Sequence, residues 1–330
     1  MKIFLSGYYG FGNLGDEALL SGILSALKPS LGSKLCVLSH NPKGTRELHG
    51  IGAVHRLYGL PNLLGQGVLV SGGGGLLQDK TSARSLHYYL GVITLAKRLG
   101  HRVIIYGQSV GPLSTDGERA VARVLRGVPI AVRDKPSQEL LARLELPSAL
   151  VADSALLLPR PEGQPQDPAP VVLVPRGGYP AVTATLKALA ARLQAESIPV
   201  AALTFQADED GPALAEIRAQ VPALNILKAQ TPQDALVYLS RSRHVVSARL
   251  HGLILAARAR RPFSGLAYDP KVTAFMAEAG GHAHPLEVDA ATLRTEIDSS
   301  TFSWGAVEAL EARAENGVRW LVGQLEAAQS

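Results

Sequence analysis

The sequence predicts an α/β protein with a GT-B-like architecture: two doubly wound parallel-sheet domains of the Rossmann type facing across a cleft. Short apolar segments bounded by glycine alternate with longer segments of helical periodicity along the whole chain. The length of 330 residues suits two globular domains. A proline-rich stretch without apolar periodicity, residues 159–170, predicts a linker between domains at 1–158 and 171–330. Ligands of such sheets bind outside the carboxyl ends of the strands, so the chemistry is expected at strand-to-helix turns.

The first domain is expected to contain six strands, each an apolar segment followed by glycine or polar residues. They lie near residues 2–7, 34–39, 67–73, 102–108, 129–134 and 148–153. Helices are expected at residues 12–29, 85–100, 117–126 and 137–144. Asp16 and Glu17 fall in the first turn of the first helix, where acidic side chains suit the positive end of the helix dipole.

The second domain repeats this alternation. Its strands are expected near residues 171–177, 199–205, 225–229, 244–248, 263–268 and 285–288. The helix after Thr231 begins with proline, and Asp234 completes the spacing of a capping box. The segment from Phe302 to the end predicts a long amphipathic helix with one apolar face, formed by Leu310, Val318, Leu321 and Leu325.

Composition excludes several classes of protein. With 46% hydrophobic residues the chain is neither disordered nor fibrous. A single cysteine, Cys36, permits no internal disulfide and suits a reducing cytoplasm. No signal peptide is expected and no apolar run approaches the ~18 residues that span a bilayer, so we expect a cytoplasmic protein. The net charge of +5 suits an anionic ligand or lipid surface but not nucleic acid, and 5% aromatic residues predict no platform for stacking bases.

The first glycine-rich turn formally matches a dinucleotide fingerprint. It runs from Gly10 to Gly15 between a predicted strand and a predicted helix. The next strand ends at residues 39–41 without the acidic side chain that binds a ribose hydroxyl, which disfavours nicotinamide or flavin. A turn that only lets the helix pack on the strand does not require Asn13 or Asp16, so these two are candidate site residues.

The second glycine-rich turn has four glycines in a row, residues 72–75, after an apolar strand. Ordering four glycines costs much backbone entropy, so something is expected to approach this backbone closely. Gly73 and Gly74 are therefore candidate binding residues. The P-loop pattern ending in Gly-Lys-Ser/Thr is absent, which excludes an ordinary P-loop NTPase.

The strongest chemical cluster is Arg249 and His251, at the carboxyl end of an apolar strand. A guanidinium there can bind a carboxylate or phosphate with two hydrogen bonds, and an imidazole can exchange a proton near neutral pH. The alternative is an exposed arginine and a histidine satisfied by its surroundings. Lys271 follows the next strand and is expected at the adjacent turn.

A further arginine, Arg133, ends a strand of the first domain and is expected to face the same ligand. Its alternative role is a surface pair with Asp134. Arg176, after the first strand of the second domain, is either another anion contact or a surface residue, and the sequence favours neither.

Three weaker patterns have ordinary explanations. Asp208 and Asp210 have the spacing of a nucleotide-sugar metal site, but can instead cap a helix from Gly211. His282 and His284 lack a third ligand nearby and favour a polar loop. Cys36 lies in an apolar run, which predicts a buried structural thiol.

Six motifs along the chain together resemble the polysaccharide pyruvyltransferase family, most closely its CsaB-type bacterial members. They are Gly10–Glu17, Ser71 with the four glycines, Gln108–Pro112, Val132–Asp134, Arg249–His251 and Tyr268–Val272. The motifs occur in order over nearly the whole chain. One departure is Asp153-Ser154, where the family often has Asp-Pro after the last strand of the first domain.

The resemblance implies a GT-B-like fold and transfer of pyruvate from phosphoenolpyruvate to a sugar hydroxyl pair as a ketal, with no cofactor and no metal. The implied acceptor is N-acetylmannosamine in a lipid-linked precursor of a secondary cell-wall polysaccharide, which anchors S-layer proteins. The first domain is then the acceptor side and the second the donor side.

The roles expected from this reaction fall into three groups. Asp16 and His251 are the catalytic residues, as acceptor base and proton-transfer group. The donor-binding residues are Arg133, Arg249 and Lys271, because a small polyanion bound without metal needs fixed cations. The acceptor-binding residues are Asn13, Gly73 and Gly74.

Because the implied acceptor is attached to a lipid, a positively charged helical face is of interest as a membrane contact. Arg119, Arg123 and Arg126 are spaced four and three residues apart. Such a run is usually a solvated face. We keep the hypothesis that it meets the anionic inner face of the cytoplasmic membrane.

Two other functions are compatible with the sequence. One is a nucleotide-sugar-dependent glycosyltransferase or epimerase on the same scaffold, which fold alone does not separate. The other is a non-catalytic carbohydrate- or anion-binding protein, which leaves Asp16 and His251 without proton chemistry.

Overall fold

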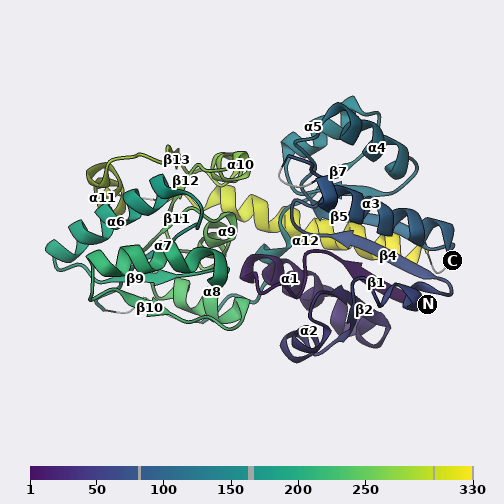
Figure 1. Ribbon diagram of the computed structural model, residues 1–330, viewed down its shortest axis with the longest axis horizontal. Coiled ribbons are helices and arrows are strands. Elements are labelled where there is room, and N and C mark those ends of the chain that lie inside the picture. The colour runs from purple at the N-terminus through teal and green to yellow at the C-terminus, as the bar shows by residue number, and fades with distance from the viewer. Residues whose placement is uncertain (81–82, 163–166, 300–301, 329–330) are drawn as a thin grey trace. The chain divides into compact units, whose positions relative to one another are not determined.

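The computed structural model describes residues 1–80, 83–162, 167–299 and 302–328. The chain divides into two compact units, each an α/β domain with a wholly parallel sheet, which confirms the predicted fold class (Figure 1). The first unit comprises residues 1–11, 19–157 and 311–330, and the second comprises residues 12–18 and 158–310.

This division differs from the boundaries expected from the sequence in two segments. Residues 311–330 lie in the first unit, whereas the sequence places them in the C-terminal domain; residues 12–18 lie in the second. The central part of the expected linker, residues 163–166, lies outside the described residues.

The sheet of the first unit has the order β3-β2-β1-β4-β5-β6-β7. Its strands are β1 (Lys2–Ser6), β2 (Leu35–Ser39), β3 (Gly52–His55), β4 (Gly67–Gly72), β5 (Arg102–Gln108), β6 (Ile130–Val132) and β7 (Ala149–Leu150). The strands β2 and β3 are added on one side of β1, and β4 to β7 are added on its other side. The switch point, where such sheets bind ligands, therefore lies at the carboxyl ends of β1 and β4.

Helices and 3-10 turns connect these strands. They are α1 (Leu14–Leu31), η1 (Gly32–Lys34), α2 (Pro42–His49), η2 (Leu60–Leu63), α3 (Ala83–Arg98), α4 (Thr115–Leu125), α5 (Lys135–Arg143) and η3 (Ser154–Leu157). The sequence analysis missed β3 and α2. β3 has only four residues, and α2 is mostly polar but begins with Pro42 after the capping side chain of Asn41.

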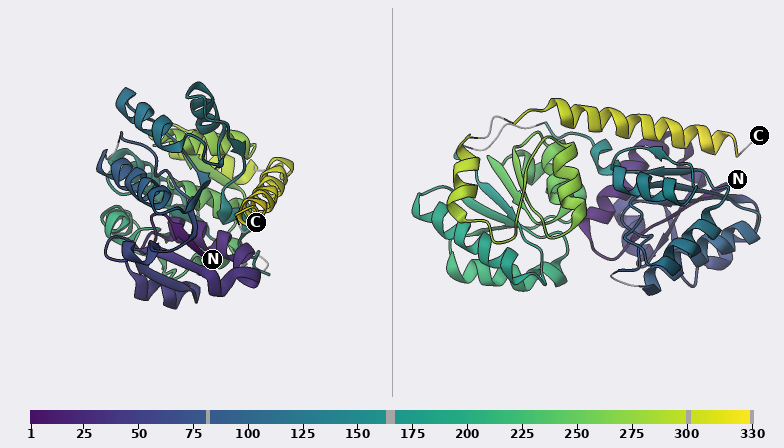
Figure 2. Two further views of the ribbon diagram at one scale, coloured as in Figure 1. Left: turned by 90° about the vertical axis from the view of Figure 1, so that its right-hand side faces the viewer. Right: turned by 90° about the horizontal axis from the view of Figure 1, so that it is seen from above.

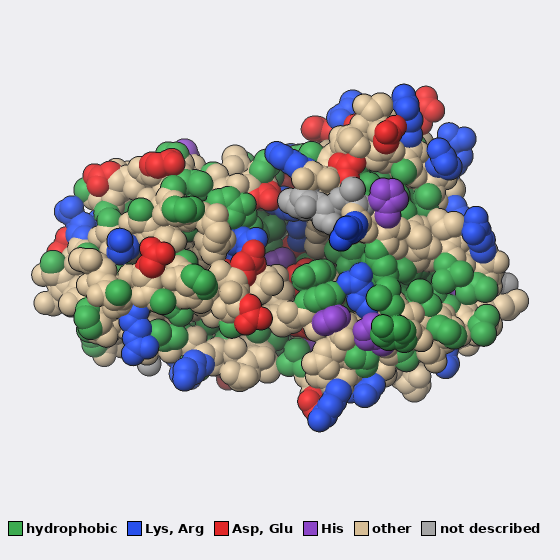
Figure 3. Space-filling view, viewed as in Figure 1, with side chains coloured by type: hydrophobic (Ala, Val, Ile, Leu, Met, Phe, Trp, Pro, Cys, Tyr) green, Lys and Arg blue, Asp and Glu red, His purple; other side chains and the backbone are tan. Residues whose placement is uncertain are grey.

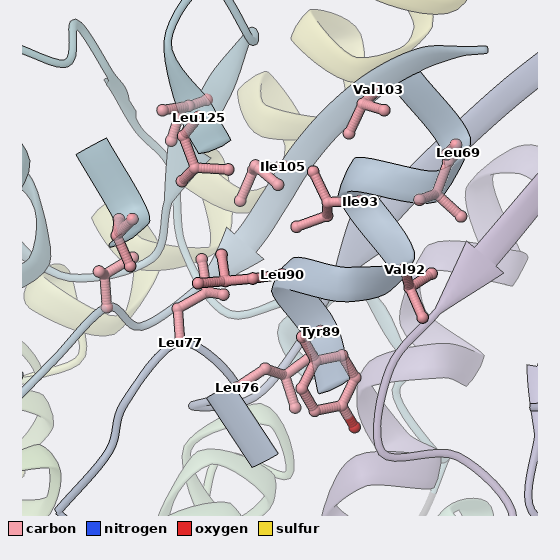
Figure 4. Close-up of a cluster of buried hydrophobic side chains, with 14 of the residues drawn as sticks. Leu69, Leu76, Leu77, Tyr89, Leu90, Val92, Ile93, Val103, Ile105 and Leu125 are labelled. Atoms are coloured by element: carbon pink, nitrogen blue, oxygen red, sulfur yellow. The ribbon is translucent and has the colours of Figure 1, made fainter. Parts of the chain in front are cut away.

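Both faces of this sheet are covered by apolar side chains. On one face, residues of β4 and β5 such as Leu69, Val103 and Ile105 pack against Tyr89, Ile93 and other residues of α3 (Figure 4). On the other face, α1 packs together with Leu321 and Leu325 of helix α12 (Gly305–Glu326). Figure 2 shows α12, in yellow, running along this unit. The expected apolar face of the last helix is thus confirmed, with Val318 only half-buried.

The sheet of the second unit has the order β10-β9-β8-β11-β12-β13. Its strands are β8 (Val171–Val174), β9 (Val200–Leu203), β10 (Asn225–Leu227), β11 (His244–Ser247), β12 (Phe263–Leu266) and β13 (Ala283–His284). The switch point here lies between β8 and β11. The strand expected at 285–288 is wrong, because Pro285 lacks an N–H and Val288 closes a turn onto its carbonyl.

The helices of the second unit cover both faces of its sheet (Figure 2). They are α6 (Pro180–Ala195), α7 (Ala207–Gln220), α8 (Pro232–Ser240), α9 (Leu250–Arg258), α10 (Pro270–Glu278) and α11 (Ala290–Ser299). The capping box of Thr231 and Asp234 is confirmed. α7 begins at Ala207 and not at Gly211 as expected, so the acidic residues 208–210 form its first turn.

No helix in the described parts of the chain is both long enough and apolar enough to cross a membrane.

Candidate active site

Two arginines of the second unit lie at its switch point. Arg176 follows β8 and Arg249 follows β11, and these two strands pair in parallel with Val174 opposite Ser247. The Ala248 N–H donates to the Val174 carbonyl at 3.0 Å, which extends the ladder to the point where both chains leave the sheet. Parallel pairing therefore brings the two arginines to one edge.

Arg249 is buried and held by two carboxylates. It is 8% exposed and is the N-cap residue of α9. Its Nε donates to both carboxylate oxygens of Asp210 at 3.1 Å, and its Nη2 donates to Asp210 and, at 2.9 Å, to Glu209. Burial disfavours the charged guanidinium, but the hydrogen bonds and charges of the two carboxylates outweigh it and raise the pKa of Arg249. The alternative of an exposed arginine is wrong.

Asp210 is the buried anchor of this arrangement. It is fully buried and accepts the backbone N–H groups of Phe205 and Gln206 at 3.1 Å and of Gly177 at 3.2 Å. A Cβ on Gly177 would lie 1.6 Å from the Glu209 carbonyl oxygen, so only glycine lets the turn after β8 approach α7 this closely. Asp210 thus accepts backbone N–H groups at the start of α7 and orients Arg249. Because α7 begins at Ala207, the expected cap of a helix from Gly211 is wrong.

Glu209 lies between two arginines. Its carboxylate pairs with Arg249 and with Arg176, whose guanidinium also lies 5.8 Å from the centre of the Tyr268 ring. Burial alone would raise the pKa of Glu209, but its hydrogen bonds to Arg176 and Arg249 lower it. Glu209 is 34% exposed, whereas Asp210 is fully enclosed, so Glu209 is the partner that an incoming anion can replace.

Lys271 lies at the next strand end, as expected. β12 is the parallel neighbour of β11, and Lys271 lies in the first turn of α10 after Asp269 caps that helix. The Asp269 carboxylate accepts the Lys271 N–H at 2.9 Å and lies 3.9 Å from its Nζ. Lys271 is about one-third exposed, so its ammonium group is accessible from solvent.

His251 lies in the first turn of α9 against the beginning of α1. A Cβ on Gly15 would lie 2.3 Å from Nδ1 of His251, so the imidazole rests on the Gly15 backbone. The Leu14 N–H donates to the Phe205 carbonyl at 2.8 Å, which fixes this turn to the same unit. Asp16 is the next residue along this turn.

Asn13 organises the turn that carries Asp16. Its Oδ1 accepts the N–H of Gly15 at 2.9 Å and that of Asp16 at 3.4 Å, so it caps α1. Its Nδ2 lies 3.3 Å from Oε1 of Gln206. The contact with His251 therefore explains Gly15, the last glycine of this turn.

Arg133 belongs to the first unit and is buried, at 8% exposure. Its Nη1 lies 2.6 Å from Asp153, and its Nε donates to Ser109 at 2.8 Å. Asp134 caps α5 and lies 4.0 Å away. The alternative of a surface pair with Asp134 is wrong, and Asp153, unassigned in the sequence analysis, is the partner of Arg133.

Other segments of the chain form hydrogen bonds with the four-glycine segment after β4. Gly73 and Gly74 have φ values of +78° and +77°, and Tyr9 donates to the Gly72 carbonyl at 2.7 Å. The Ser109 N–H donates to the Gly74 carbonyl at 2.9 Å. A role of Gly73 and Gly74 in acceptor binding stays a prediction.

The weaker sequence signals have structural explanations. His284 pairs with Glu296, and the rings of His282 and His284 lie 5.0 Å apart. Among the described residues, no three His, Cys, Asp or Glu side chains are grouped as a metal ion requires. Cys36 is half-buried and not fully buried as expected, and burial raises the pKa of its thiol.

The site thus includes residues that sequence reasoning missed or left open. Arg176 had no favoured role, and Glu209 had none at all. The available signal was an acidic segment in the first turn of the helix after β9 together with an Arg-Gly turn after β8, but only folding shows that the two segments meet.

Solved structures of nucleotide-sugar enzymes share this fold. Superposition on Staphylococcus aureus MnaA in complex with UDP gives a TM-score of 0.68 at 8% identity, covering 98% of this chain and 95% of that one. UDP-GlcNAc 2-epimerase from Neisseria meningitidis gives 0.62 at 11% identity, with 99% and 100% covered. A glycosyltransferase from Rickettsia africae gives 0.60 at 11%, with 100% and 99% covered. These likenesses establish a GT-B-like fold.

Family membership comes from the sequence. No curated protein matches this chain significantly. The model of the polysaccharide pyruvyl transferase family matches residues 13–270, from Asn13 at the start of α1 to Pro270 at the start of α10, and so includes every arginine described above. The chain belongs to the polysaccharide pyruvyl transferase family.

Proposed function

We propose that this protein transfers pyruvate from phosphoenolpyruvate to two hydroxyls of N-acetylmannosamine in a lipid-linked polysaccharide precursor, as CsaB-type members do. The observation that carries the proposal is the turn after β11, which places Arg249 and His251 two residues apart, with the Gly15–Asp16 turn packed against His251. Cation, proton carrier and carboxylate thus belong to one unit.

The donor-binding step is an exchange of anions. Phosphoenolpyruvate carries a phosphate and a carboxylate, and both pair well with a planar guanidinium. Glu209 already holds Arg176 and Arg249 in position. A donor phosphate or carboxylate takes the place of the partly exposed Glu209, while the buried Asp210 keeps Arg249 oriented. Lys271 supplies a further charge, and we assign Arg133 to the donor as well.

The chemical step follows from the structure of the donor. The methylene carbon gains a proton and becomes a methyl group, and the adjacent carbon becomes oxocarbenium-like. One sugar hydroxyl attacks this carbon and loses its proton. Phosphate leaves with the donor's C–O electron pair, and the second hydroxyl closes the ketal with loss of its own proton. We assign proton transfer to His251 and acceptor deprotonation to Asp16, with Asn13, Gly73 and Gly74 binding the acceptor.

The direct test is incubation with phosphoenolpyruvate and a synthetic lipid-linked disaccharide ending in N-acetylmannosamine. Phosphate release together with a product heavier by the pyruvate ketal is the expected result. His251→Ala and Asp16→Ala should each lower the rate by ~10²–10⁴. Turnover of a nucleotide sugar, with no phosphate released from phosphoenolpyruvate, would instead identify a glycosyltransferase or epimerase.

A further inference from the structure

Five aromatic side chains of the first unit form a continuous series at one edge of its sheet. Tyr8 and Phe11 follow β1, His40 follows β2, and His55 ends β3 with Tyr58 three residues later. We call these five residues the aromatic ladder. It lies at the carboxyl ends of three adjacent parallel strands, the edge where such sheets bind ligands.

The rings of the ladder are stacked. Tyr8 and Phe11 have ring centres 4.0 Å apart and planes within 7°, and Phe11 and His40 are 4.3 Å apart and within 5°. His40 and His55 are 6.1 Å apart and tilted by 50°. His55 and Tyr58 are 4.7 Å apart and inclined by 23°. Low aromatic content predicts no such platform, yet folding gathers the rings from three loops.

Contacts with Arg56 and hydrogen bonds within the loop support the ladder. The guanidinium of Arg56 lies 3.8 Å from the Tyr88 ring centre and 5.2 Å from that of Phe11, and Tyr88 donates to the Arg56 carbonyl at 2.9 Å. Nδ1 of His55 accepts the N–H groups of Leu57 and Tyr58, both at 3.2 Å. His55 therefore fixes the loop that carries Tyr58, and in its neutral form it holds its proton on Nε2.

The outer end of the ladder faces solvent. Tyr58 is 83% exposed, the largest exposure of any large hydrophobic side chain in the described residues, and His40 is also exposed. One face of Tyr58 stacks on His55, so its other face is open to a ligand. Figure 3 shows histidine and hydrophobic side chains together over the region of β1, β2 and α2.

We propose that the aromatic ladder binds a sugar ring of the acceptor glycan other than the one that receives pyruvate. A pyranose has one face of C–H groups, which packs on an aromatic ring, and hydroxyls at its rim, which hydrogen-bond to imidazole and tyrosine groups. The inference rests on the proposed function, because it requires an acceptor that contains further sugars besides the one that receives pyruvate. Phe11 precedes Asn13, an assigned acceptor residue, by two residues in the chain.

A sugar fits the ladder better than the two other ligands that aromatic surfaces attract. A nucleotide needs cations for its phosphates beside the ring, whereas Arg56, the arginine of this cluster, is stacked between rings. A membrane surface would use the neighbouring exposed Leu64 as much as Tyr58, which gives a clear experimental distinction.

The test measures binding and turnover separately with a soluble disaccharide ending in N-acetylmannosamine. Tyr58→Ala and His40→Ala should each weaken disaccharide binding about tenfold by NMR titration, and Tyr58→Phe should restore it. Phosphoenolpyruvate affinity should not change. Leu64→Ala is the matched control, because Leu64 is also highly exposed, at 72%, lies six residues after Tyr58 along the chain and has no ring.

The outcomes separate this inference from the proposed function. Ring-dependent binding supports the ladder even if no phosphate is released from phosphoenolpyruvate. Phosphate release with disaccharide affinity unchanged in Tyr58→Ala and His40→Ala would overturn the ladder and leave the function intact. Ring-dependent binding of uridine monophosphate instead of the disaccharide, or equal losses of vesicle binding in Tyr58→Ala and Leu64→Ala, would also overturn it.

Discussion

At the scale of single residues, the proposed donor site depends on which of two adjacent carboxylates is buried. Asp210 is fully enclosed and serves three backbone N–H groups as well as Arg249. Glu209 is partly exposed and pairs with two arginines. Adjacent carboxylates therefore have different roles: Asp210 positions Arg249, and Glu209, in the function proposed above, competes with the donor for it.

This difference predicts opposite effects of two conservative substitutions. Glu209→Gln should tighten phosphoenolpyruvate binding about threefold to tenfold, because the competing charge is gone. Asp210→Asn should weaken it at least tenfold and lower the free energy of unfolding by about 3 kcal/mol, because Arg249 loses its buried partner. Calorimetric titration and urea unfolding measure the two quantities. Weaker donor binding in Glu209→Gln would show that Glu209 supports the donor instead of competing with it.

Gly15 is a second residue whose role is set by its neighbour. Gly15→Ala should lower turnover at least tenfold, because the new methyl group would lie 2.3 Å from Nδ1 of His251 and must displace the imidazole. Gly91→Ala, in helix α3 with no atom within 4 Å of the new Cβ, is the control and should keep full turnover. Equal rates for both variants and the parent protein would remove His251 from the mechanism.

At the scale of elements, a buried polar network joins β11, β12, β13 and α11 of the second unit. His244 is 1% exposed and lies 2.8 Å from Ser264, and His284 pairs with Glu296. Burial is the main cause that lowers the pKa of His244 to about 4, and the charge of Arg243 lowers it further, against the opposing charge of Glu296. The strands are thus joined around a histidine that stays neutral in the folded protein.

The network makes stability depend on pH. The unfolded chain protonates His244 below about pH 6.5, and the folded chain does so only near pH 4, so folding stability falls as the pH drops through this window. The expected loss from this group is about 2–3 kcal/mol between pH 7 and pH 4.5. Urea unfolding of the parent and of His244→Phe at both pH values isolates it. An identical pH dependence in the two proteins would contradict the burial argument.

Helix α12 is the element whose domain the sequence misplaced. Leu321 is fully buried in the core of the first unit. Leu321→Ala should therefore lower the free energy of unfolding by about 2–5 kcal/mol, whereas Leu64→Ala at a 72% exposed position should change it little. Fluorescence of Trp320, within α12, and of Trp304, directly before it, follows the transition. Equal stability of the two variants would show that α12 is not part of this core.

At the scale of the whole molecule, both units have the same strand progression, and each presents its functional candidates after the strands around its switch point. The first unit carries the four-glycine turn, Arg133 and the aromatic ladder, and the second carries Arg176, Arg249, Lys271, His251 and the turn from Asn13 to Asp16. A lipid-linked acceptor would also bring the molecule to a membrane surface, where exposed cations matter.

The exposed arginines of α4 and its C-cap test this last point. Arg119, Arg123 and Arg126 are exposed, although Arg126 lies one residue beyond the helix and Arg119 pairs with Asp116. Replacing all three by alanine should lower sedimentation with anionic vesicles severalfold, at about 1 kcal/mol for each charge near the surface. Binding that persists unchanged, or that is independent of salt, would exclude this face as the contact.

The sequence by itself determined the repeated α/β pattern, the glycine turns, the capping box at Thr231 and the family motifs, because these depend on local periodicity and on residues near one another in the chain. It also located Arg249, His251 and Lys271 at strand ends. Only the tertiary structure decided that Asp210 and Glu209 hold Arg249, that Asp153 holds Arg133, that Gly15 supports His251 and that α12 completes the first unit. The physical reason is that parallel pairing and burial join segments tens of residues apart, and a buried charge takes whichever partner folding brings to it.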